Sequence, residues 1–314
     1  MPPLTLTTQA VPPHPELPPV PPGPAPDLLL HAVEDGVAVA RAGVWTRGPT
    51  WAGRRTGLIG LYAAVHDDAG RAVLNAACTH LSSGGADLAV GPLNGSTWFS
   101  YRLVTDVGDA PPFALDLHTP PADVSVWASA GFSPLLTYHS AVATPGTLPP
   151  DPRAADLRAR FADVTVRPPG PDLNADLRAI HALSLAAFAG NPFYAPIPFG
   201  AFEALYAPLL ARAPLDWVWL AERHGELVGF MFNVPDPAWP GTLVVKTVAA
   251  RPGRANAGLG RFLANELHAR AFRAGFARVV HALMWDGNDS AALSARRGRV
   301  IRRYALFARE LASE

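Results

Sequence analysis

The stretch Arg251-Pro-Gly-Arg-Ala-Asn-Ala-Gly-Leu-Gly260 lies between two segments whose patterns are easy to interpret. Before it, the valine-rich run from Thr242 to Ala250 predicts a buried strand. After it, apolar residues recur at helical spacing from about Ala257 to Ala274, which predicts an amphipathic helix. Gly258 and Gly260 therefore fall at the helix start, where free backbone N–H groups and the positive end of the helix dipole point outward.

Three arginines surround this helix start. Arg251, Arg254 and Arg261 add positive charge, and glycine lets a diphosphate approach the backbone closely. An anionic cofactor such as coenzyme A needs both features. A Gly-x-Gly pair taken alone more often marks an ordinary helix start, so the neighbouring elements must decide between the two interpretations.

The rest of the second half alternates strand and helix signals. Asp172 is expected to cap a helix that runs to about Ala189. His224-Gly225 between two apolar runs predicts a β-hairpin. The predicted order is β-α-α-β-β-β-α-β-α-β. The other expected segments are strands at 164–166, 217–221, 227–232, 279–285 and 300–307, and helices at 199–212 and after 288.

In this order and spacing, the second half resembles the GNAT superfamily of N-acetyltransferases. Four pieces carry the resemblance: 164–168, the hairpin 220–230, the strand and loop 246–260, and 288–298 before a terminal strand. The resemblance implies the acyl-CoA N-acyltransferase fold, an α/β (α+β layered) architecture with a mixed, mostly antiparallel central sheet flanked by helices. It places this domain at residues 153–314.

The resemblance also implies where acetyl-CoA is held. Backbone N–H groups at the helix start would cradle the pyrophosphate, and the end of the preceding strand would pair with the pantetheine arm. Asn288 would lie near that arm, although its position equally suits an N-cap. The family's signature loop, Gln/Arg-x-x-Gly-x-Gly/Ala, has Ala255 at its first position here, so Arg254 is the candidate substitute. The implied cofactor-binding residues are Val248, Ala249, Ala250, Arg254, Asn256, Ala257, Gly258, Leu259, Gly260, Arg261 and Asn288.

Acetyl transfer to an amine needs a neutral nucleophile and a proton for the leaving thiolate. The family's tyrosine position falls near Ser294 and Ala295, and neither can replace tyrosine. Tyr304 on the last strand is the nearest alternative acid, although a half-buried strand tyrosine would give the same pattern. Glu222 and Asp286, at strand ends, are further catalytic candidates, and solvated turn residues are the alternative interpretation.

Two features suggest how an acceptor would bind. Lys246, the only lysine, stands in a strand where the family often has a carboxylate, so it either binds an acidic group or extends to solvent from a strand edge. In the family, the connection at 191–199 shapes the acceptor site. Phe193 and Tyr194 within it would suit an apolar or aromatic amine, or a rigid loop that packs on the core. The expected acceptor is a small-molecule amine or an amino acid.

Residues 28–143 share the order of elements with the second half, which suggests a degenerate GNAT-like copy and a duplicated fold. The copy lacks the phosphate loop, because its helix begins at Asp67-Asp68, whose carboxylates would repel a diphosphate. We therefore expect one coenzyme A site, in the second half. The stretch from Gly91 to Trp98 is expected to be a structural turn, with Ser96 and Thr97 as an alternative site lining.

Composition bounds the remaining possibilities. Eleven prolines within residues 1–27 predict a disordered tail, and the proline-rich stretch 144–152 predicts a linker. The 26 basic and 26 acidic residues cancel, which argues against a nucleic-acid partner. The single cysteine, Cys78, excludes a cysteine-cluster metal site, and no metal is expected. Without an apolar run long enough for a membrane or a secretion signal, we expect a cytoplasmic bacterial protein, as a monomer or homodimer.

The sequence thus predicts an acetyl-CoA-dependent N-acetyltransferase that transfers the acetyl group directly to a primary amine in a ternary complex. The alternative is a catalytically impaired acyl-CoA-binding pseudoenzyme that acts as a scaffold or sensor. The missing tyrosine, the missing carboxylate and Ala255 support that alternative.

Overall fold

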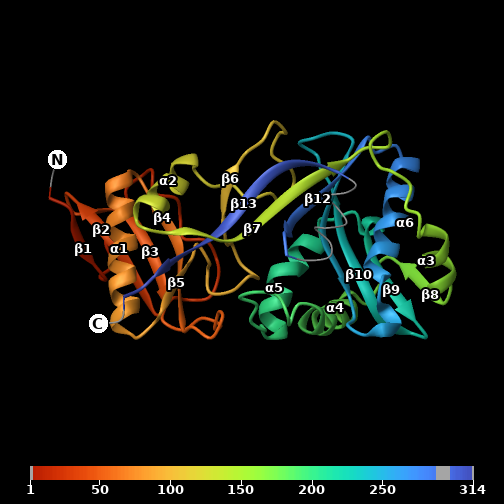
Figure 1. Cartoon of the computed structure of the whole chain (residues 1–314), viewed down its shortest axis with the longest axis horizontal. Helices are drawn as coiled ribbons and strands as arrows, with labels where there is room; N and C mark the ends of the chain where they lie inside the picture. The colour runs from red at the N-terminus through yellow and green to blue at the C-terminus, as the bar shows by residue number, and fades with distance from the viewer. Residues whose placement is uncertain (1–2, 288–297, 313–314) are drawn as a thin grey trace.

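The computed structural model describes residues 3–287 and 298–312. Figure 1 shows an elongated molecule in which the first half of the chain and the second half lie at opposite ends. Two long strands, β7 (Ser133–Ala143) and β13 (Arg299–Glu310), run side by side across the middle. Among the described residues, no helix combines the length and the apolar character needed to cross a membrane.

The described part of the second half forms the elements that the sequence predicts, with shifts of a few residues at their ends and one additional helix, α3; the helix expected after Asn288 lies outside the described residues. The Asp172 side chain caps α4 by accepting a hydrogen bond of 3.0 Å from the Ala175 N–H. His224 and Gly225 have φ values of 51° and 79°, the left-handed backbone that a two-residue hairpin turn requires. The elements are α3 (Ala154–Arg160), β8 (Val164–Arg167), α4 (Leu173–Ala187), α5 (Phe199–Leu210), β9 (Val218–Arg223), β10 (Glu226–Pro235), β11 (Thr242–Ala250), α6 (Leu259–Arg273), β12 (Arg278–Trp285) and β13.

The first half repeats the central part of this order. Two antiparallel strands, a third strand, a helix and a parallel strand occur in both halves, so β2-β3-β4-α1-β5 corresponds to β9-β10-β11-α6-β12. The strands β2 and β3 were not expected from the sequence. The elements are β1 (Thr5–Thr7), β2 (Leu28–Glu34), β3 (Val37–Trp45), β4 (Thr56–Ala64), α1 (Asp67–Ser83), β5 (Leu88–Gly91), β6 (Leu103–Asp106), α2 (Pro121–Ser129) and β7.

The two halves exchange their last strands. All thirteen strands of the described residues join one sheet in the order β1-β2-β3-β4-β5-β13-β7-β12-β11-β10-β9-β8, with β6 paired to β13. The last strand of the first half, β7, pairs with β12 of the second half, whereas β13 of the second half pairs with β5 of the first. Each half therefore completes its sheet with a strand from the other.

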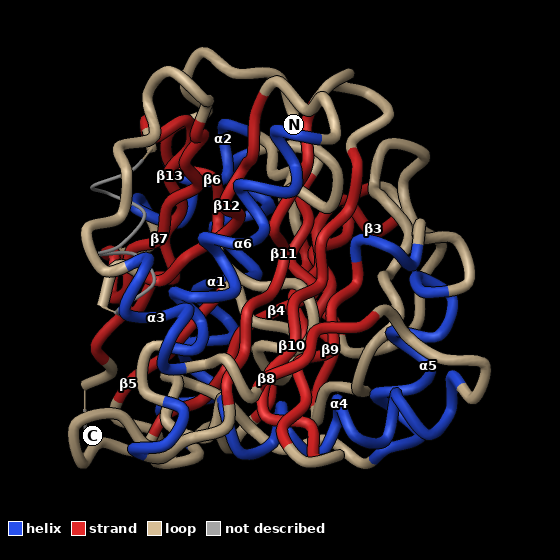
Figure 2. Tube along the Cα trace, turned by 90° about the vertical axis from the view of Figure 1, so that its right-hand side faces the viewer, coloured by secondary structure: helices blue, strands red, loops and turns tan. Residues whose placement is uncertain are grey.

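Helices cover both faces of the sheet in the second half. The apolar side chains of α3 and α6 pack on one face of β9, β10 and β11, and those of α4 and α5 pack on the other. Helices α1 and α2 pack against the strands of the first half, where Cys78 lies buried as expected. Figure 2 shows α6 crossing in front of the strands of the second half.

The N-terminal segment corrects the predicted disorder. Strand β1 pairs antiparallel with β2, and Leu17 is buried against the sheet. The buried guanidinium of Arg41 donates hydrogen bonds to the carbonyl groups of Pro18 and Pro19. Proline blocks helix formation but leaves its carbonyl free to accept, so the sheet edge orders this segment.

The predicted linker is also held at its end. The Asp151 carboxylate, almost fully buried, receives bonds of 2.5 and 2.7 Å from the Arg261 guanidinium and one of 2.7 Å from the Asn265 amide. The predicted domain boundaries at 28–143 and 153–314 stay a prediction.

Candidate functional site

A cavity of about 950 Å³ lies where β11 and β12 separate. The two strands pair in parallel only from Thr242–Val245 to Arg278–His281, although both continue beyond that point. The residues that follow, Lys246 to Val248 and Ala282 to Met284, line the cavity from its two sides. The cavity extends from the N-terminus of α6 to an aromatic cluster and to two segments of the first half, 97–102 and 115–117.

The start of α6 forms the first end of the cavity. Gly258 precedes the helix with a φ of 93°, and no side chain caps the helix at this residue. The first helical N–H groups consequently face outward without an intrahelical acceptor, at the positive end of the dipole. A Cβ added to Gly260 would meet only Val248 Cγ1, at 3.5 Å, so the surface here is shallow and open. This end suits an anion such as a diphosphate.

The cavity brings together about half of the expected cofactor residues. Val248, Ala250, Asn256, Gly258, Gly260 and Arg261 line it. The others among the described residues do not. Ala249 and Leu259 point into the apolar core, and Arg254 and Ala257 are exposed and do not line the cavity, so Arg254 as the substitute for the missing loop side chain stays a prediction. Asn288, Ser294 and Ala295 lie outside the described residues.

Two arginines at this end differ in availability. The Arg261 side chain is paired with Asp151, and hydrogen bonds from Arg261 and Asn265 hold the pKa of Asp151 well below its usual range despite burial. Arg153 precedes α3 and lines the cavity with an exposed side chain. Arg153 was not predicted from the sequence, because it lies more than 100 residues before Gly258. The only signal for it was the absence of a cation at Ala255.

Lys246 lines the cavity on the β11 side, where β11 and β12 have separated. It is the extra residue of a bulge in β11, since Val245 pairs with Asn233 and Thr247 pairs with Phe232. Its Nζ donates a 2.8 Å hydrogen bond to the carbonyl of Leu115. Desolvation, helped by the nearby Arg102 guanidinium and partly offset by Asp116, lowers the pKa of Lys246 to about 7. A lysine that is partly neutral near pH 7 can accept a proton.

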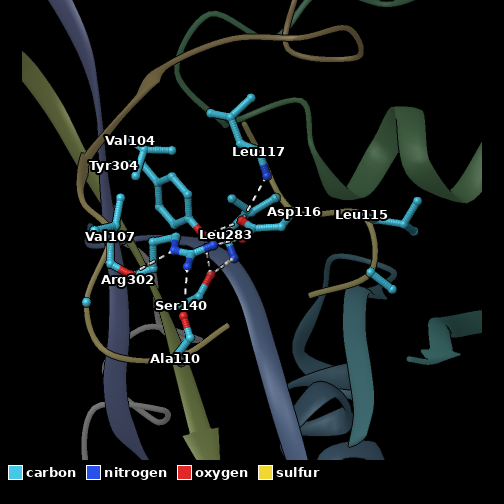
Figure 3. A network of polar contacts seen from close by, with 12 residues as sticks. Val104, Val107, Ala110, Leu115, Asp116, Leu117, Ser140, Leu283, Arg302 and Tyr304 are labelled. Atoms are coloured by element: carbon cyan, nitrogen blue, oxygen red, sulfur yellow. Dashed lines mark hydrogen bonds and ion pairs between the residues drawn. The ribbon is translucent and has the colours of Figure 1, made fainter. Parts of the chain in front are cut away.

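A buried polar network supports the loop that contacts Lys246 (Figure 3). Leu115 points away from this network, whereas the Asp116 carboxylate pairs with Arg302 and accepts a 2.8 Å hydrogen bond from the Tyr304 hydroxyl. Ser140 lies 3.1 Å from the same hydroxyl. The network thereby joins β7, β13 and the loop at 115–117.

Tyr304 is therefore not placed as an acid for the cavity. Its side chain is 1% exposed, belongs to this network and does not line the cavity. Burial raises the pKa of Tyr304 above its usual range. The structure does not support the role predicted for Tyr304, because its ring is buried in an apolar cluster with Leu136 and Tyr138 of β7.

The two predicted carboxylates also lie elsewhere. Glu222 accepts a 2.6 Å bond from Arg167, which also pairs with Asp176, and this cluster connects β8 to α4. Asp286 lies 2.5 Å from Nδ1 of His139 at the β12–β7 junction. Neither carboxylate lines the cavity, so both are structural partners of cationic or imidazole groups.

The second end of the cavity is aromatic. The Trp98 ring contacts Phe188, Tyr194, Phe202 and Tyr206 at centroid distances of 5.7 to 6.4 Å. We call these five residues the Trp98 cluster, and all of them line the cavity. Tyr194 is thus placed as expected. The stretch that ends at Trp98 also lines the cavity through Thr97. It is therefore more than the structural turn that the sequence predicts.

Phe193 is a correction. It is 3% exposed and stacks on Trp51 of the first half at 5.3 Å, with its backbone at a φ of 56°. Tyr194 lines the cavity, whereas Phe193 packs against Trp51 of the first half.

Comparisons with known proteins agree with this geometry. The family model described as Acetyltransferase (GNAT) family matches residues 182–298, which include the cavity strands and the start of α6. No curated protein sequence matches the chain.

Three solved structures share the fold at low sequence identity. A probable N-acyltransferase from Enterococcus faecalis aligns with a TM-score of 0.53 and 11% identity, over 91% of this chain and 62% of that one. The glucosamine N-acetyltransferase region of a fungal multi-domain β-N-acetylglucosaminidase aligns at 0.52 and 11%, over 90% and 33%. A GCN5-related N-acetyltransferase from Anabaena variabilis aligns at 0.51 and 12%, over 90% and 63%. The chain thus spans 33% to 63% of the lengths of these structures. Residues 182–298 thus match the GNAT acetyltransferase family model, and the chain shares the fold of these three structures.

Proposed function

We propose that the protein is an acetyl-CoA-dependent N-acetyltransferase that transfers the acetyl group directly to a primary amine of a small molecule. One observation carries the proposal: the uncapped start of α6 and the gap between β11 and β12 belong to one cavity, with Lys246 between them. Such a cavity offers an anion site at one end and an apolar acceptor pocket at the other.

The residues present fit coenzyme A at the α6 end. The backbone N–H groups from Gly258 to Arg261 would hold the diphosphate, and Arg153 would supply the charge that Ala255 lacks. Thr247, Val248 and Ala250 line the gap in which β12 no longer pairs with β11, and the backbone of this segment would pair with the amides of the pantetheine arm. When bound, acetyl-CoA supplies an acyl group activated as a thioester.

Lys246 is the proposed proton acceptor. Its neutral form would take the proton that the acceptor nitrogen loses when the nitrogen bonds to the acyl carbon. It can return a proton to sulfur when the carbon–sulfur bond breaks, so the exchange leaves Lys246 unchanged.

Two further observations support direct transfer. A cavity of about 950 Å³ lies at the upper end of the range usual for ligand pockets, which leaves room for two reactants. The only cysteine, Cys78, is buried in the core of the first half and cannot form an acyl-enzyme at this cavity.

Replacement of Gly260 tests the cofactor site. Gly260→Asp places a carboxylate at the open helix start without a positive-φ conflict, and an acidic residue in a first turn stabilises the helix. We expect acetyl-CoA affinity to fall by about 10²-fold or more in calorimetry, since like charges meet where the helix dipole had attracted an anion. The matched control is Gly260→Ala, which fills the same position without charge and should retain most of the affinity. Equal affinity for the two variants would contradict the proposed site.

A second function is favoured by one specific observation. None of the three predicted acid–base residues, Glu222, Asp286 and Tyr304, lines the cavity. An acyl-CoA-binding pseudoenzyme would account for that finding. Steady thiol release from acetyl-CoA with a panel of amines supports the transferase, and binding without release supports the pseudoenzyme.

A further inference from the structure

Arg102 is a buried cation that the fold of the first half brings into the cavity wall. The residue is 6% exposed, and its guanidinium lies between the rings of Tyr101 and Tyr138, at 3.8 and 4.3 Å from their centroids. Its Nη1 donates a 3.2 Å hydrogen bond to the carbonyl of Leu283 on β12. Its Nε is buried, and within residues 3–287 and 298–312 it meets no hydrogen-bond acceptor.

No ion pair formed by the described residues includes Arg102. A buried charge is destabilising unless an opposite charge and hydrogen bonds compensate it. The flanking tyrosine faces offset part of that penalty and hold the guanidinium plane in a fixed orientation. The Nε atom is enclosed by the protein, so the donors left for an anion in the cavity are those of the two Nη groups, and none of the described residues provides that anion.

The charges of the cavity agree with this assignment. Four cations line it, Arg102, Arg153, Lys246 and Arg261, against one carboxylate among the described lining residues, Asp116. Asp116 is engaged by Arg302, Tyr304 and the Leu117 N–H, and its single charge offsets only part of the positive charge of the cavity. Two of the cations, Arg102 and Lys246, are close enough for Arg102 to lower the pKa of Lys246. An acceptor whose only charged group is an ammonium would be repelled by Arg102 and Lys246.

The Trp98 cluster adjoins the Arg102 site through Tyr101. Tyr206 of the cluster lies near Tyr101, and burial, helped by the repulsion that a second phenolate at Tyr101 would exert, raises the pKa of Tyr206 to about 12. Leu177 and Ile180 of α4 complete the apolar lining. The cavity thus presents a cation for one substituent and an aromatic pocket for another, with Lys246 nearby.

We propose that the acceptor is an amine that also bears a carboxylate and an apolar or aromatic side group, the chemistry of an amino acid. Arg102 binds the carboxylate as a bidentate partner, the Trp98 cluster holds the side group, and the amine is left toward Lys246. Arg102 is then a specificity-determining residue that the first half contributes to the active site of the second. This inference rests on the proposed transferase function.

Matched acceptor pairs test the proposal. L-phenylalanine, L-tyrosine and L-leucine are compared with phenethylamine, tyramine and isoamylamine, which differ only by the carboxylate. Thiol release gives kcat/KM for each, and calorimetry with the full chain gives affinity for each even without turnover. We expect at least one amino acid to exceed its decarboxylated partner by about 10²-fold, as is usual for a buried charge pair.

Variants of Arg102 test whether this residue causes the preference for amino acids. Arg102→Gln should lower kcat/KM for the preferred amino acid by about 10²-fold more than for its decarboxylated partner. Both members share any loss that follows from the altered pKa of Lys246, so the ratio between them tests the carboxylate contact. Arg102→Lys should retain part of the preference, since it keeps the charge but not the planar fork. Unchanged acetyl-CoA affinity in both variants separates this result from a failure of the cofactor site.

Three outcomes would overturn the inference. They are equal use or equal binding of the two members of every pair by the unaltered protein, no binding of any of the three amino acids, and an equal loss for both members of a pair in Arg102→Gln. Loss of acetyl-CoA binding by Gly260→Asp would stand in any of these cases, so the proposed function is judged independently.

Discussion

In each half of the molecule a pair of parallel strands separates at the same structural point, but the two halves differ in what fills the gap between the strands. In the first, β4 pairs with β5 in parallel from Thr56 to Leu58, and in the second, β11 pairs with β12 from Thr242 to Val245. Just beyond, both strands carry a bulge against their antiparallel neighbour, near Leu61 in β4 and at Lys246 in β11. The repeated fold thus creates two equivalent gaps.

The first half closes its gap with its own chain. The Leu93 N–H donates to the Ile59 carbonyl at 2.8 Å, and the Asn94 side-chain oxygen accepts from the Leu61 N–H at 2.7 Å. A Cβ on Gly60 would lie 2.5 Å from the Leu93 carbonyl oxygen, so the chain fills this gap tightly. In the second half, the equivalent gap is the cavity. A strand gap of this kind holds a ligand only where no loop of the chain replaces it.

The helix starts show the same difference, because the start of α1 is occupied by side chains and the start of α6 is open. The His66 ring caps α1 by accepting from the Ala69 N–H at 3.3 Å, and Asp67 and Asp68 occupy its first turn. Helix α6 begins at Gly258 with no side-chain cap. Only the second half therefore combines an open gap with an open helix start, which supports the expectation of one coenzyme A site.

The largest expected effect concerns the strand exchange. Residues 153–314 expressed alone lack β7, so β12 loses its antiparallel partner and β13 loses every strand it pairs with. We expect this fragment to remain unfolded or to aggregate, as judged by circular dichroism and gel filtration, because its exposed strand edges are apolar.

A cut chain is the matched control. A protease site inserted at the exposed Gly146, whose Cβ position meets no atom within 4 Å, severs the chain between β7 and α3. The two pieces should co-elute and bind acetyl-CoA like the intact protein. A fragment 153–314 that folds and binds acetyl-CoA by itself would show that the halves are independent.

The next effect concerns the bulge residue, which is leucine in one half and lysine in the other. Lys246→Met should lower the rate constant at saturating acceptor by about 10²-fold, the usual contribution of a general base. In the unaltered protein this rate constant should rise about tenfold per pH unit below pH 7 and level off above it, because the pKa of Lys246 is about 7. The inflection should disappear in Lys246→Met.

Lys246→Arg separates a proton acceptor from a fixed cation, since arginine stays charged at these pH values. It should be as impaired as Lys246→Met, and an active Lys246→Arg would make the residue a cation for an acidic group. Stability provides a check on folding. The pKa of Lys246 is lowered in the folded protein, so the unfolded chain binds more protons between pH 7 and 10.5, and stability rises with pH there. Lys246→Met should remove that slope.

Local patterns predicted much of this comparison. The strand at Thr242–Ala250 was confirmed to the residue, and the helix starts at Asp67 and near Gly258 were placed correctly, because periodicity and caps depend on neighbours in sequence. Most of the residues predicted to bind the cofactor lie at the end of this strand and at the start of this helix, so local patterns could identify them. Six of them line the cavity.

The rest depended on contacts between distant segments. Tyr304 was misplaced because the register of β13 against β7 fixes its direction, and no local pattern reveals that pairing. Arg102 and Asp116 could not be found, since more than 120 residues separate them from Lys246 and a loop from the first half brings them there. The N-terminal prolines indicated disorder, yet an unpaired sheet edge accepted β1.

The smallest expected effect lies in the closed gap. Asn94→Ala leaves the buried Leu61 N–H without its acceptor, so the free energy of unfolding measured in urea should fall by about 1–3 kcal/mol. Ser125→Ala on the exposed face of α2 is the control and should change it by less than about 0.5 kcal/mol. The variant should still bind one acetyl-CoA per chain, because Asp67, Asp68 and His66 continue to occupy the start of α1. Two sites in Asn94→Ala would mean that the loop at Asn94, rather than the charged and capped helix start, is what keeps the first half empty.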